Sequence, residues 1–213
     1  MVAHYHSSSA EAERLTQTLA GYGARCHVLK ADLASEQETS EFLRSLDAYT
    51  IDSLVNNAGS YGVKRHFSEL TVGDIVATFM VNSVSPMLLT SRLFTRMKAK
   101  GFGRIVNISS IAAKYGGSSE SLHYGCSKRA LEAITRTLAR EGAPFNILAN
   151  TVRPGVIDTK FHKRFPKDMT KRVAMIPLKR MGQPDDVADM VFYLGGDRNN
   201  FITGEVITVA GGE

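Results

Sequence analysis

The chain has 213 residues, of which 43% are hydrophobic and 22% charged, and its formal net charge is +5. This balance argues against collagen-like, coiled-coil and disordered chains. A chain of this length buries roughly 70% of the surface that its unfolded form exposes, so it needs neither disulfides nor a structural metal. No apolar run approaches the ~20 residues of a membrane span, and no secretory signal follows Met1. We expect one globular domain over residues 1–213, in the cytoplasm and without a membrane partner; the cysteines Cys26 and Cys126 are typical of a reducing compartment.

Short β-branched or apolar runs alternate along the chain with longer amphipathic stretches. This alternation is typical of a parallel sheet with helices on both faces. The sequence therefore predicts an α/β fold with a doubly wound parallel sheet and three layers. The expected strands are Val2 to Tyr5, Cys26 to Lys30, Ser53 to Asn56, Arg104 to Ile108, Asn146 to Val152 and Val206 to Val209.

Helix signals lie between these runs. Two capping boxes are expected, the first from Ser8 and Glu11 and the second from Ser35 and Glu38. A long helical stretch over residues 72–100 tolerates its internal proline only with a kink or a break. Further helices are expected over residues 124–140 and from residue 184 onward, where a proline occupies a first-turn position.

One pair of side chains suggests acid–base chemistry. Tyr124 and Lys128 lie four residues apart on a predicted helix, so they share one helix face. A phenol with a pKa near 10 transfers protons poorly at neutral pH, but a neighbouring ammonium favours the phenolate and lowers that pKa. Tyr124 is the only one of the seven tyrosines with lysine at this spacing. By itself the pair is equally compatible with a tyrosine packed on a lysine stem.

Further motifs, in order along the chain, make the sequence resemble the short-chain dehydrogenase/reductase family, whose members are nicotinamide-dependent oxidoreductases with a Rossmann-like fold. The resemblance covers essentially all 213 residues, and its most similar branch is that of the 3-oxoacyl-(acyl-carrier-protein) reductases. It implies that Ser110, Tyr124 and Lys128 are the catalytic serine, tyrosine and lysine. It also implies that Asn82 distorts its helix and, through a water molecule, supports the lysine. Asn82 in a helix has the alternative of capping the break before Pro86.

The same resemblance implies a cofactor site. Four segments of the chain match family motifs that contact the cofactor. They are Asp32 and Leu33 at the adenine; Asn56, Ala58 and Gly59 of Asn-Asn-Ala-Gly; Tyr124 and Lys128; and Pro154, Gly155, Val156 and Thr159 at the nicotinamide carboxamide. The strand Val2 to Tyr5 is followed by His6 and Ser7, with no acidic residue before Glu11. An acid there would accept the ribose hydroxyls of NAD and repel a 2′-phosphate, so NADP(H) is favoured over NAD(H). His6 and Ser7 are then the candidate contacts of the 2′-phosphate, and capping of the following helix is the alternative role of Ser7.

The implied reaction is the reduction of a carbonyl to a hydroxyl. Hydride reaches the carbonyl carbon from the reduced nicotinamide, Tyr124 protonates the developing alkoxide, and Ser110 donates a hydrogen bond to the same oxygen. Ser109 competes with Ser110 for this role, and the spacing of the family favours Ser110. No metal site is expected, because His4 and His6 lack a third ligand at a telling spacing.

The stretch from residue 160 to residue 175 corresponds to the substrate lid of the family. Its first part is basic, with Lys160, Lys163, Arg164, Lys167, Lys171 and Arg172 against Asp168. Such a run is often only a solvated face, but it also suits an acidic carrier or substrate. We expect a small-molecule carbonyl or an acyl-carrier-protein-bound substrate, no nucleic acid, and a homo-oligomer, either a dimer or a tetramer.

One motif of the family is missing from the sequence. None of the 18 glycines forms the Thr-Gly-x-x-x-Gly-x-Gly turn that holds the pyrophosphate. We expect the first strand and this glycine-rich turn to be absent from the chain, whose central sheet would then have a gap. Two interpretations follow: an N-terminally incomplete record of an active reductase, or a non-catalytic homologue that acts as a subunit or an interaction protein.

Overall fold

The computed structural model describes residues 1–160 and 168–213. The chain divides into two compact units, residues 1–50 and residues 51–213, and each is described by itself. All six expected strands are present, with ends within two residues of the expected ones. Every pair of neighbouring strands is parallel. The strands form one two-stranded and one four-stranded sheet, so strand pairing is not continuous, in line with the gap expected in the central sheet.

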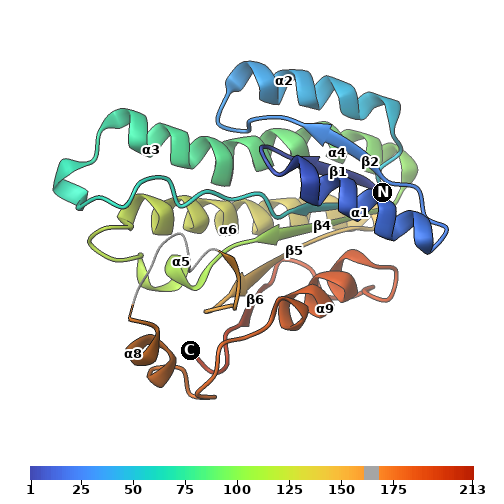
Figure 1. The fold of residues 1–213 in the computed structure, drawn as a ribbon. Helices are drawn as coiled ribbons and strands as arrows, with labels where there is room; N and C mark the ends of the chain where they lie inside the picture. Colours follow the sequence, from blue (N-terminus) through green and yellow to red (C-terminus); the bar gives the residue numbers. More distant parts are fainter. Residues whose placement is uncertain (161–167) are drawn as a thin grey trace. The chain divides into compact units, whose positions relative to one another are not determined.

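The first unit contains the two-stranded sheet. Its elements in chain order are β1 (Val2–Tyr5), α1 (Ser9–Gly21), β2 (His27–Lys30), α2 (Glu36–Ser45) and the 3₁₀ helix η1 (Leu46–Ala48) (Figure 1). The strands pair in register from Val2 opposite His27 to Tyr5 opposite Lys30. Phe42 and Leu46 are buried, and the His4 ring lies 5.1 Å from the Phe42 ring. A small apolar core therefore holds this unit together.

The helix starts in this unit differ from the expected capping boxes. Ser8 is the N-cap of α1, but its side chain makes no capping hydrogen bond. Ser35 does cap α2, accepting a bond from the Glu38 amide at 3.2 Å. The Glu38 carboxylate accepts a bond from the Asp32 amide at 2.8 Å instead of turning back to Ser35. The first capping box is therefore wrong and the second is half formed, because the carboxylate has a better-placed donor in the preceding loop.

The second unit carries the four-stranded sheet in the order β3-β4-β5-β6. Its elements are β3 (Ser53–Asn56), η2 (Phe67–Glu69), α3 (Val72–Phe79), the π-helix η3 (Met80–Val84), α4 (Ser85–Lys100), β4 (Gly103–Ile108), α5 (Ile111–Tyr115), α6 (Leu122–Gly142), η4 (Ala143–Phe145), β5 (Ile147–Pro154), α8 (Met169–Ala174), α9 (Pro184–Gly195) and β6 (Val206–Val209). The short helices α5 and α8 were not expected from the sequence.

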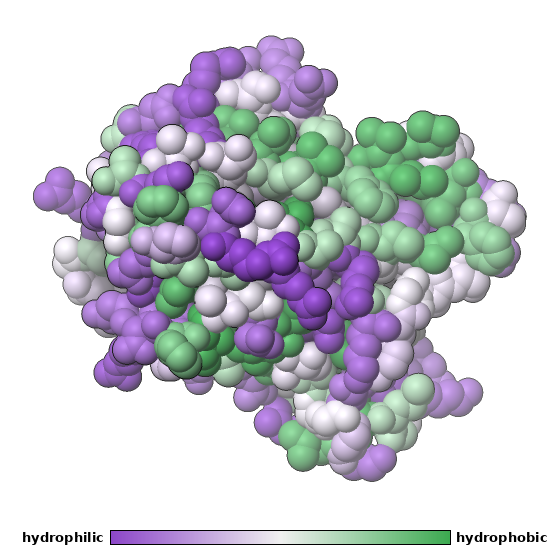
Figure 2. Space-filling model, turned by 180° about the vertical axis from the view of Figure 1, so that it is seen from behind, coloured by the Kyte–Doolittle hydropathy of each residue, from purple (hydrophilic) through white to green (hydrophobic). Residues whose placement is uncertain are grey.

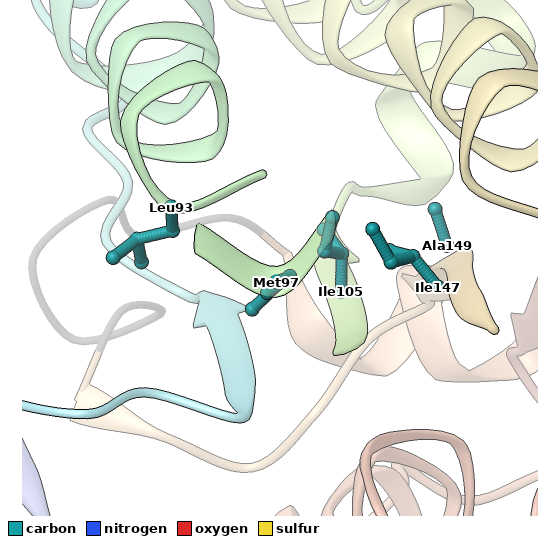
Figure 3. Close-up of a cluster of buried hydrophobic side chains, with 5 residues drawn as sticks. All are labelled: Leu93, Met97, Ile105, Ile147 and Ala149. Atoms are coloured by element: carbon teal, nitrogen blue, oxygen red, sulfur yellow. The ribbon is translucent and has the colours of Figure 1, made fainter. Parts of the chain in front are cut away.

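Helices cover both faces of this sheet, as the apolar strands require. On one face, Leu93 and Met97 of α4 pack with Ile105 of β4 and with Ile147 and Ala149 of β5 (Figure 3). On the other face, Leu194 of α9 packs with Val106, Ile108 and Val152. Successive residues of β4 point to opposite faces, so its six residues are all buried. This unit therefore has the three layers that the sequence predicts.

The long helical stretch is interrupted where the sequence predicts a break. The α-helical hydrogen bonding changes to a π-helix over Met80–Val84, and α4 begins at Ser85, directly before Pro86. Proline has no amide hydrogen and fits the first turn of a helix, where that donor is not needed. Asn82 lies inside the π-helix and is fully buried. The break therefore places an amide side chain in the interior of the unit.

The same stretch carries exposed apolar side chains. Figure 2 shows a hydrophobic area over α3, and the exposed residues of α3, η3 and α4 include Val72, Ile75, Val76, Val84, Met87 and Leu88. By length and composition alone, Val72–Lys100 could cross a membrane, which corrects the expectation that no apolar run is long enough. This is weak evidence for a membrane span, because Leu89, Leu93 and Met97 of the same stretch are buried in the unit.

Candidate active site

The end of β4 places two serines beside each other with different partners. Ser109 is buried, and its hydroxyl donates to Oε1 of Glu132 at 2.7 Å. Ser110 is the N-cap of α5: its hydroxyl accepts a bond from the Ala112 amide at 3.2 Å and also bonds to Tyr124. Because the Ser109 hydroxyl is committed to an internal carboxylate, Ser110 is the serine available to a substrate. This arrangement agrees with the expected choice of Ser110.

Tyr124 lies in the first turn of α6, where that helix approaches the backbone after α5. A Cβ atom at Gly125 would lie 2.6 Å from the Gly116 carbonyl carbon, so only glycine allows this approach. The Tyr124 ring lies 5.3 Å from the ring of Tyr61, which is buried. The close packing of α6 against this turn holds the phenol next to Ser110.

The surroundings of Tyr124 raise its pKa, and this corrects the expected direction. Burial raises the pKa of the phenol above its usual value, and the hydrogen bond to Ser110 only partly offsets this effect. The expectation was a pKa lowered by Lys128. A raised pKa keeps the phenol protonated at neutral pH, so Tyr124 has a proton that it can donate.

Lys128 is buried one turn further along α6. Its Nζ atom donates to the Ile108 carbonyl oxygen at 2.8 Å, which places the ammonium at the end of β4. Burial lowers the pKa of Lys128 to about 8. A Cβ atom at Gly59 would lie 3.1 Å from Nζ, so the Asn-Asn-Ala-Gly loop passes directly over the lysine. The structure thus brings this loop and the lysine together.

Asn82 connects the same loop to α6. Its amide nitrogen donates to the Ser60 carbonyl oxygen at 2.7 Å and to the Ser127 hydroxyl at 3.0 Å. Its amide oxygen accepts a bond from the Ser60 amide at 2.9 Å. The side chain therefore bridges two segments of the site, and the alternative that it caps the helix break is wrong. The water that the family resemblance implies beside Asn82 stays a prediction.

A cavity of about 970 Å³ opens beside these groups within the second unit. Its lining residues that the sequence analysis named as site candidates are Ser109, Ser110, Tyr124, Pro154, Gly155, Val156, Thr159 and Arg172. Binding pockets of roughly 300–1,000 Å³ hold small-molecule ligands, so the cavity fits a nicotinamide ring and a substrate together. The phenol and the hydroxyls on its wall suit a ligand whose reacting group is a polar oxygen. The residues of this cavity therefore fit the nicotinamide end of the implied cofactor and a carbonyl substrate.

Other expected cofactor residues lie outside the lining of this cavity. Asn56 is buried, and its amide nitrogen donates to Asn107 at 2.8 Å and to Thr90 at 3.3 Å. Lys128 is also buried and is not among the residues that line the cavity. Ala58 is partly buried and Gly59 exposed in the loop after β3. Asn56 therefore fixes the end of the sheet, and a direct contact with a cofactor stays a prediction.

The residues expected at the adenine end belong to the first unit. His6 and Ser7 follow β1 and are exposed, while Leu33 is buried. The His6 Nε2 atom lies 3.8 Å from the Asp32 carboxylate, which forms an ion pair when the imidazole is protonated. These residues gather at one end of the two-stranded sheet. Among the described residues, no group of three or more His, Cys, Asp or Glu side chains could hold a metal ion.

The expected lid is described only in part. Lys163, Arg164 and Lys167 lie outside the described residues, which resume at Asp168 before α8. The side chain of Arg172 forms an ion pair with Glu213, and both residues line the cavity. The role of residues 160–175 as a lid stays a prediction.

Sequence reasoning missed two residues at the site. Tyr61 forms part of the cavity wall two residues after Asn-Asn-Ala-Gly, and its ring faces Tyr124. Glu132 is a buried carboxylate that bonds to Ser109 and Arg153. Glu132 follows Lys128 by four residues and therefore lies on the same helix face, and this spacing could have indicated that Glu132 belongs to the site.

Comparison with known proteins identifies relatives of the chain. The family model described as enoyl-(acyl carrier protein) reductase matches residues 1–213. The chain is 33% identical over 210 residues to the 3-oxoacyl-(acyl-carrier-protein) reductase FabG of Aquifex aeolicus, covering 97% of this chain and 84% of that protein. It is 32% identical over 216 residues to an acetoacetyl-CoA reductase of Allochromatium vinosum, covering 100% of this chain and 87% of that protein.

A solved structure has the same fold as this chain. The crystal structure of a blue fluorescent protein from a metagenomic library in complex with NADPH superimposes with a TM-score of 0.90, at 32% identity, over 99% of this chain and 86% of that one. The comparisons do not support the expectation of an absent first strand and glycine-rich turn, and they do not favour a non-catalytic homologue. The chain belongs to the short-chain dehydrogenase/reductase family and is an oxidoreductase of that family.

Proposed function

We propose that the protein reduces a ketone to an alcohol with NADPH, and that its substrate is a 3-oxoacyl thioester carried by coenzyme A or by acyl carrier protein. The observation that carries the proposal is the bonded pair of Ser110 and a protonated Tyr124 on the wall of the cavity. The relatives named as acetoacetyl-CoA reductase and 3-oxoacyl-(acyl-carrier-protein) reductase support the substrate class.

Two oxygen donors would act on the substrate carbonyl. A reduced nicotinamide, when bound, supplies the hydride. Ser110 donates a hydrogen bond to the carbonyl oxygen, and Tyr124 gives its proton to that oxygen as negative charge develops there. Donors that are already in place before the charge develops stabilise the transition state more than the ground state.

Other residues hold the reactants. Pro154, Gly155 and Val156 at the end of β5, followed by Thr159, would hold the nicotinamide ring, since they line the cavity next to Tyr124. Lys128 places an ammonium behind the tyrosine, where a partly deprotonated group with a pKa of about 8 can exchange protons near neutral pH. The lysine would thereby help to restore the proton of Tyr124 after each turnover.

We assign NADP(H) rather than NAD(H) on the basis of the residues that follow β1 in the first unit. His6 and Ser7 follow β1 where an acidic residue would select NAD. The NADPH complex of the metagenomic blue fluorescent protein supports this choice. The Asp32 carboxylate lies 3.8 Å from Nε2 of His6. A protonated His6 that binds the 2′-phosphate would therefore also form an ion pair with Asp32.

We also propose a homo-oligomer, a dimer or a tetramer, in the cytoplasm. The exposed apolar side chains of α3 and α4, which Figure 2 shows in part, support self-association, because monomeric soluble proteins rarely expose large contiguous apolar areas. Cys26 and Cys126 are both free, as in a reducing compartment. The assembly is measured by light scattering of the purified protein.

A substrate and cofactor panel tests the proposal. Acetoacetyl-CoA, a 3-oxoacyl group on acyl carrier protein, a cyclic ketone and a sugar ketone are each offered with NADPH and with NADH, and oxidation of the cofactor is followed by absorbance. We expect the highest kcat/KM for the thioesters with NADPH. A higher kcat/KM for the sugar or the cyclic ketone would contradict the substrate class, and turnover of none of the carbonyls would contradict the function.

A further inference from the structure

One buried carboxylate lies at the centre of the site without a role in the reaction described above. Glu132 is on α6, one turn after Lys128, and its side chain is 3% exposed. Its Oε1 atom accepts bonds from the Ser109 hydroxyl at 2.7 Å and from Nε of Arg153 at 2.7 Å. Its Oε2 atom accepts bonds from Nη2 of Arg153 at 2.8 Å and from Arg129 at 3.0 Å. Both oxygens are therefore fully engaged.

The network keeps this carboxylate charged. Burial by itself would raise the pKa of Glu132, but the hydrogen bonds from Arg153 and Ser109 and the charge of the guanidinium outweigh burial and lower the pKa. The pKa of Arg153 is raised by the same contact. A charge-assisted bidentate pair is directional and short, so it fixes the guanidinium plane relative to α6.

The partners of Glu132 belong to the two strand ends that form the site. Ser109 directly precedes Ser110 at the end of β4. Arg153 directly precedes Pro154 and Gly155 at the end of β5, and its Nη1 atom also donates to Thr208 of β6 at 3.2 Å. Glu132 itself is on the helix that carries Tyr124. One carboxylate thus joins the hydroxyl donor, the proton donor and the expected nicotinamide segment.

We propose that Glu132 is a positioning residue for the reduction: it holds Ser110 and the Pro154–Gly155 segment in register with Tyr124. The inference rests on the proposed function. A buried ion pair often contributes little net stability compared with apolar residues of similar volume, because burying the charges is costly. Its directional bonds, in contrast, fix geometry, and a displacement of about 1 Å in an active site can cost roughly 100-fold in rate.

The first test compares Glu132→Gln with Arg129→Ala. The glutamine keeps the shape of the side chain but turns one acceptor into a donor that faces Arg153 or Ser109. We expect kcat to fall roughly tenfold or more with a small change in KM, and the primary isotope effect with 4-deuterated NADPH to increase, because poor alignment slows hydride transfer. Arg129 contacts the same carboxylate from a side chain that is 66% exposed, so Arg129→Ala is the matched control and should keep kcat within about twofold.

A second variant separates positioning from stability. The double variant Glu132→Leu/Arg153→Met replaces both charges with apolar side chains, which often restores the stability of a buried ion-pair site. We expect it to unfold near the wild-type temperature but to keep the loss of kcat. A kcat restored to the wild-type value would overturn the proposal, as would wild-type kcat in folded Glu132→Gln. If Glu132→Gln does not fold, the double variant decides the question.

Hydrogen exchange makes the result independent of turnover. In Glu132→Gln, or in the double variant, we expect faster amide exchange at residues 109–112 and 153–156 than in the wild type, and unchanged exchange in β3. Unchanged exchange at both strand ends would refute positioning even if the wild type reduced no carbonyl. Faster exchange in a chain that reduces no carbonyl would contradict the proposed function and leave Glu132 as the residue that fixes these segments.

Discussion

Ser109 and Ser110 are chemically identical neighbours, and they differ in their hydrogen-bond partners. Both residues follow β4 and line the cavity, but the Ser109 hydroxyl donates to the buried Glu132, whereas the Ser110 hydroxyl bonds to Tyr124. The family spacing already selected Ser110 from the sequence. The sequence could not show why Ser109 is excluded, because its partner is 23 residues away.

The direction of the Tyr124 pKa also depends on contacts that spacing does not reveal. An interval of four residues places Lys128 on the same helix face, but the ammonium donates to the Ile108 carbonyl oxygen at the end of β4. Burial then dominates both groups: it raises the pKa of the phenol and lowers the pKa of the ammonium. Sequence predicts which groups meet, whereas burial decides their protonation.

The lowered pKa of Lys128 makes stability depend on pH. The pKa falls from 10.5 in the unfolded chain to about 8 in the folded protein, so between these values the unfolded chain binds more protons at this site. This site's contribution to the free energy of unfolding therefore rises with pH across that window, by about 1.4 kcal/mol per pH unit at its steepest. Urea unfolding of the wild type and of Lys128→Met measures the difference between their free energies of unfolding. We expect this difference to change by about 1 kcal/mol in favour of the wild type between about pH 7 and pH 9. A difference that is independent of pH would mean that Lys128 titrates normally.

At the scale of the elements, the π-helix is the feature that shapes the site. The break before Pro86 was predictable from proline chemistry alone. The π-helix turns Asn82 inward, where it bonds to Ser60 and Ser127. The sequence could not specify these partners, because Ser60 is in a loop and Ser127 is on another helix.

We expect Asn82→Ala to lower the free energy of unfolding by about 1–3 kcal/mol, since it leaves buried polar partners without hydrogen bonds. Thr18→Ala is a suitable control, because the Thr18 hydroxyl donates to the Arg14 carbonyl oxygen on an exposed helix face. The control should change stability by less than about 0.5 kcal/mol. Equal effects in the two variants, measured by urea unfolding, would show that the Asn82 bridge is dispensable.

Strands were easier to predict than short helices. Each of the six strands is a short run with β-branched or other apolar residues and clear ends, and each was found within two residues of its expected bounds. Helix α5 has only five residues between Ser110 and Gly116, too few for a 3.6-residue period to be visible. The capping box at Ser8 failed for another reason: a motif names residues that can bond, and local backbone geometry decides whether they do.

At the scale of the whole molecule, the two units differ in burial. All six residues of β4 are buried, whereas none of the four residues of β1 is. A two-stranded sheet by itself is marginally stable in water, and the first unit adds only a small core of its own. The sequence predicts an interruption of strand pairing from the missing glycine-rich turn, and the strands do form two separate sheets.

We expect amide hydrogen exchange to follow this difference. Amides in β4 and β5 should exchange only through global unfolding, while those in β1 and β2 should exchange roughly tenfold faster or more, through local opening. Mass spectrometry of peptic fragments measures both sheets in one experiment. Equal protection of the two sheets would show that residues 1–50 unfold only together with the rest.

The central claim is that Tyr124 donates the proton in an NADPH-dependent carbonyl reduction. The most direct measurement is the steady-state reduction of acetoacetyl-CoA by the wild type and by Tyr124→Phe, together with titration of NADPH binding by fluorescence. We predict that the variant loses about 10²–10⁴-fold in kcat, the usual contribution of a general acid, and binds NADPH as the wild type does. A variant that keeps the wild-type kcat would contradict the account.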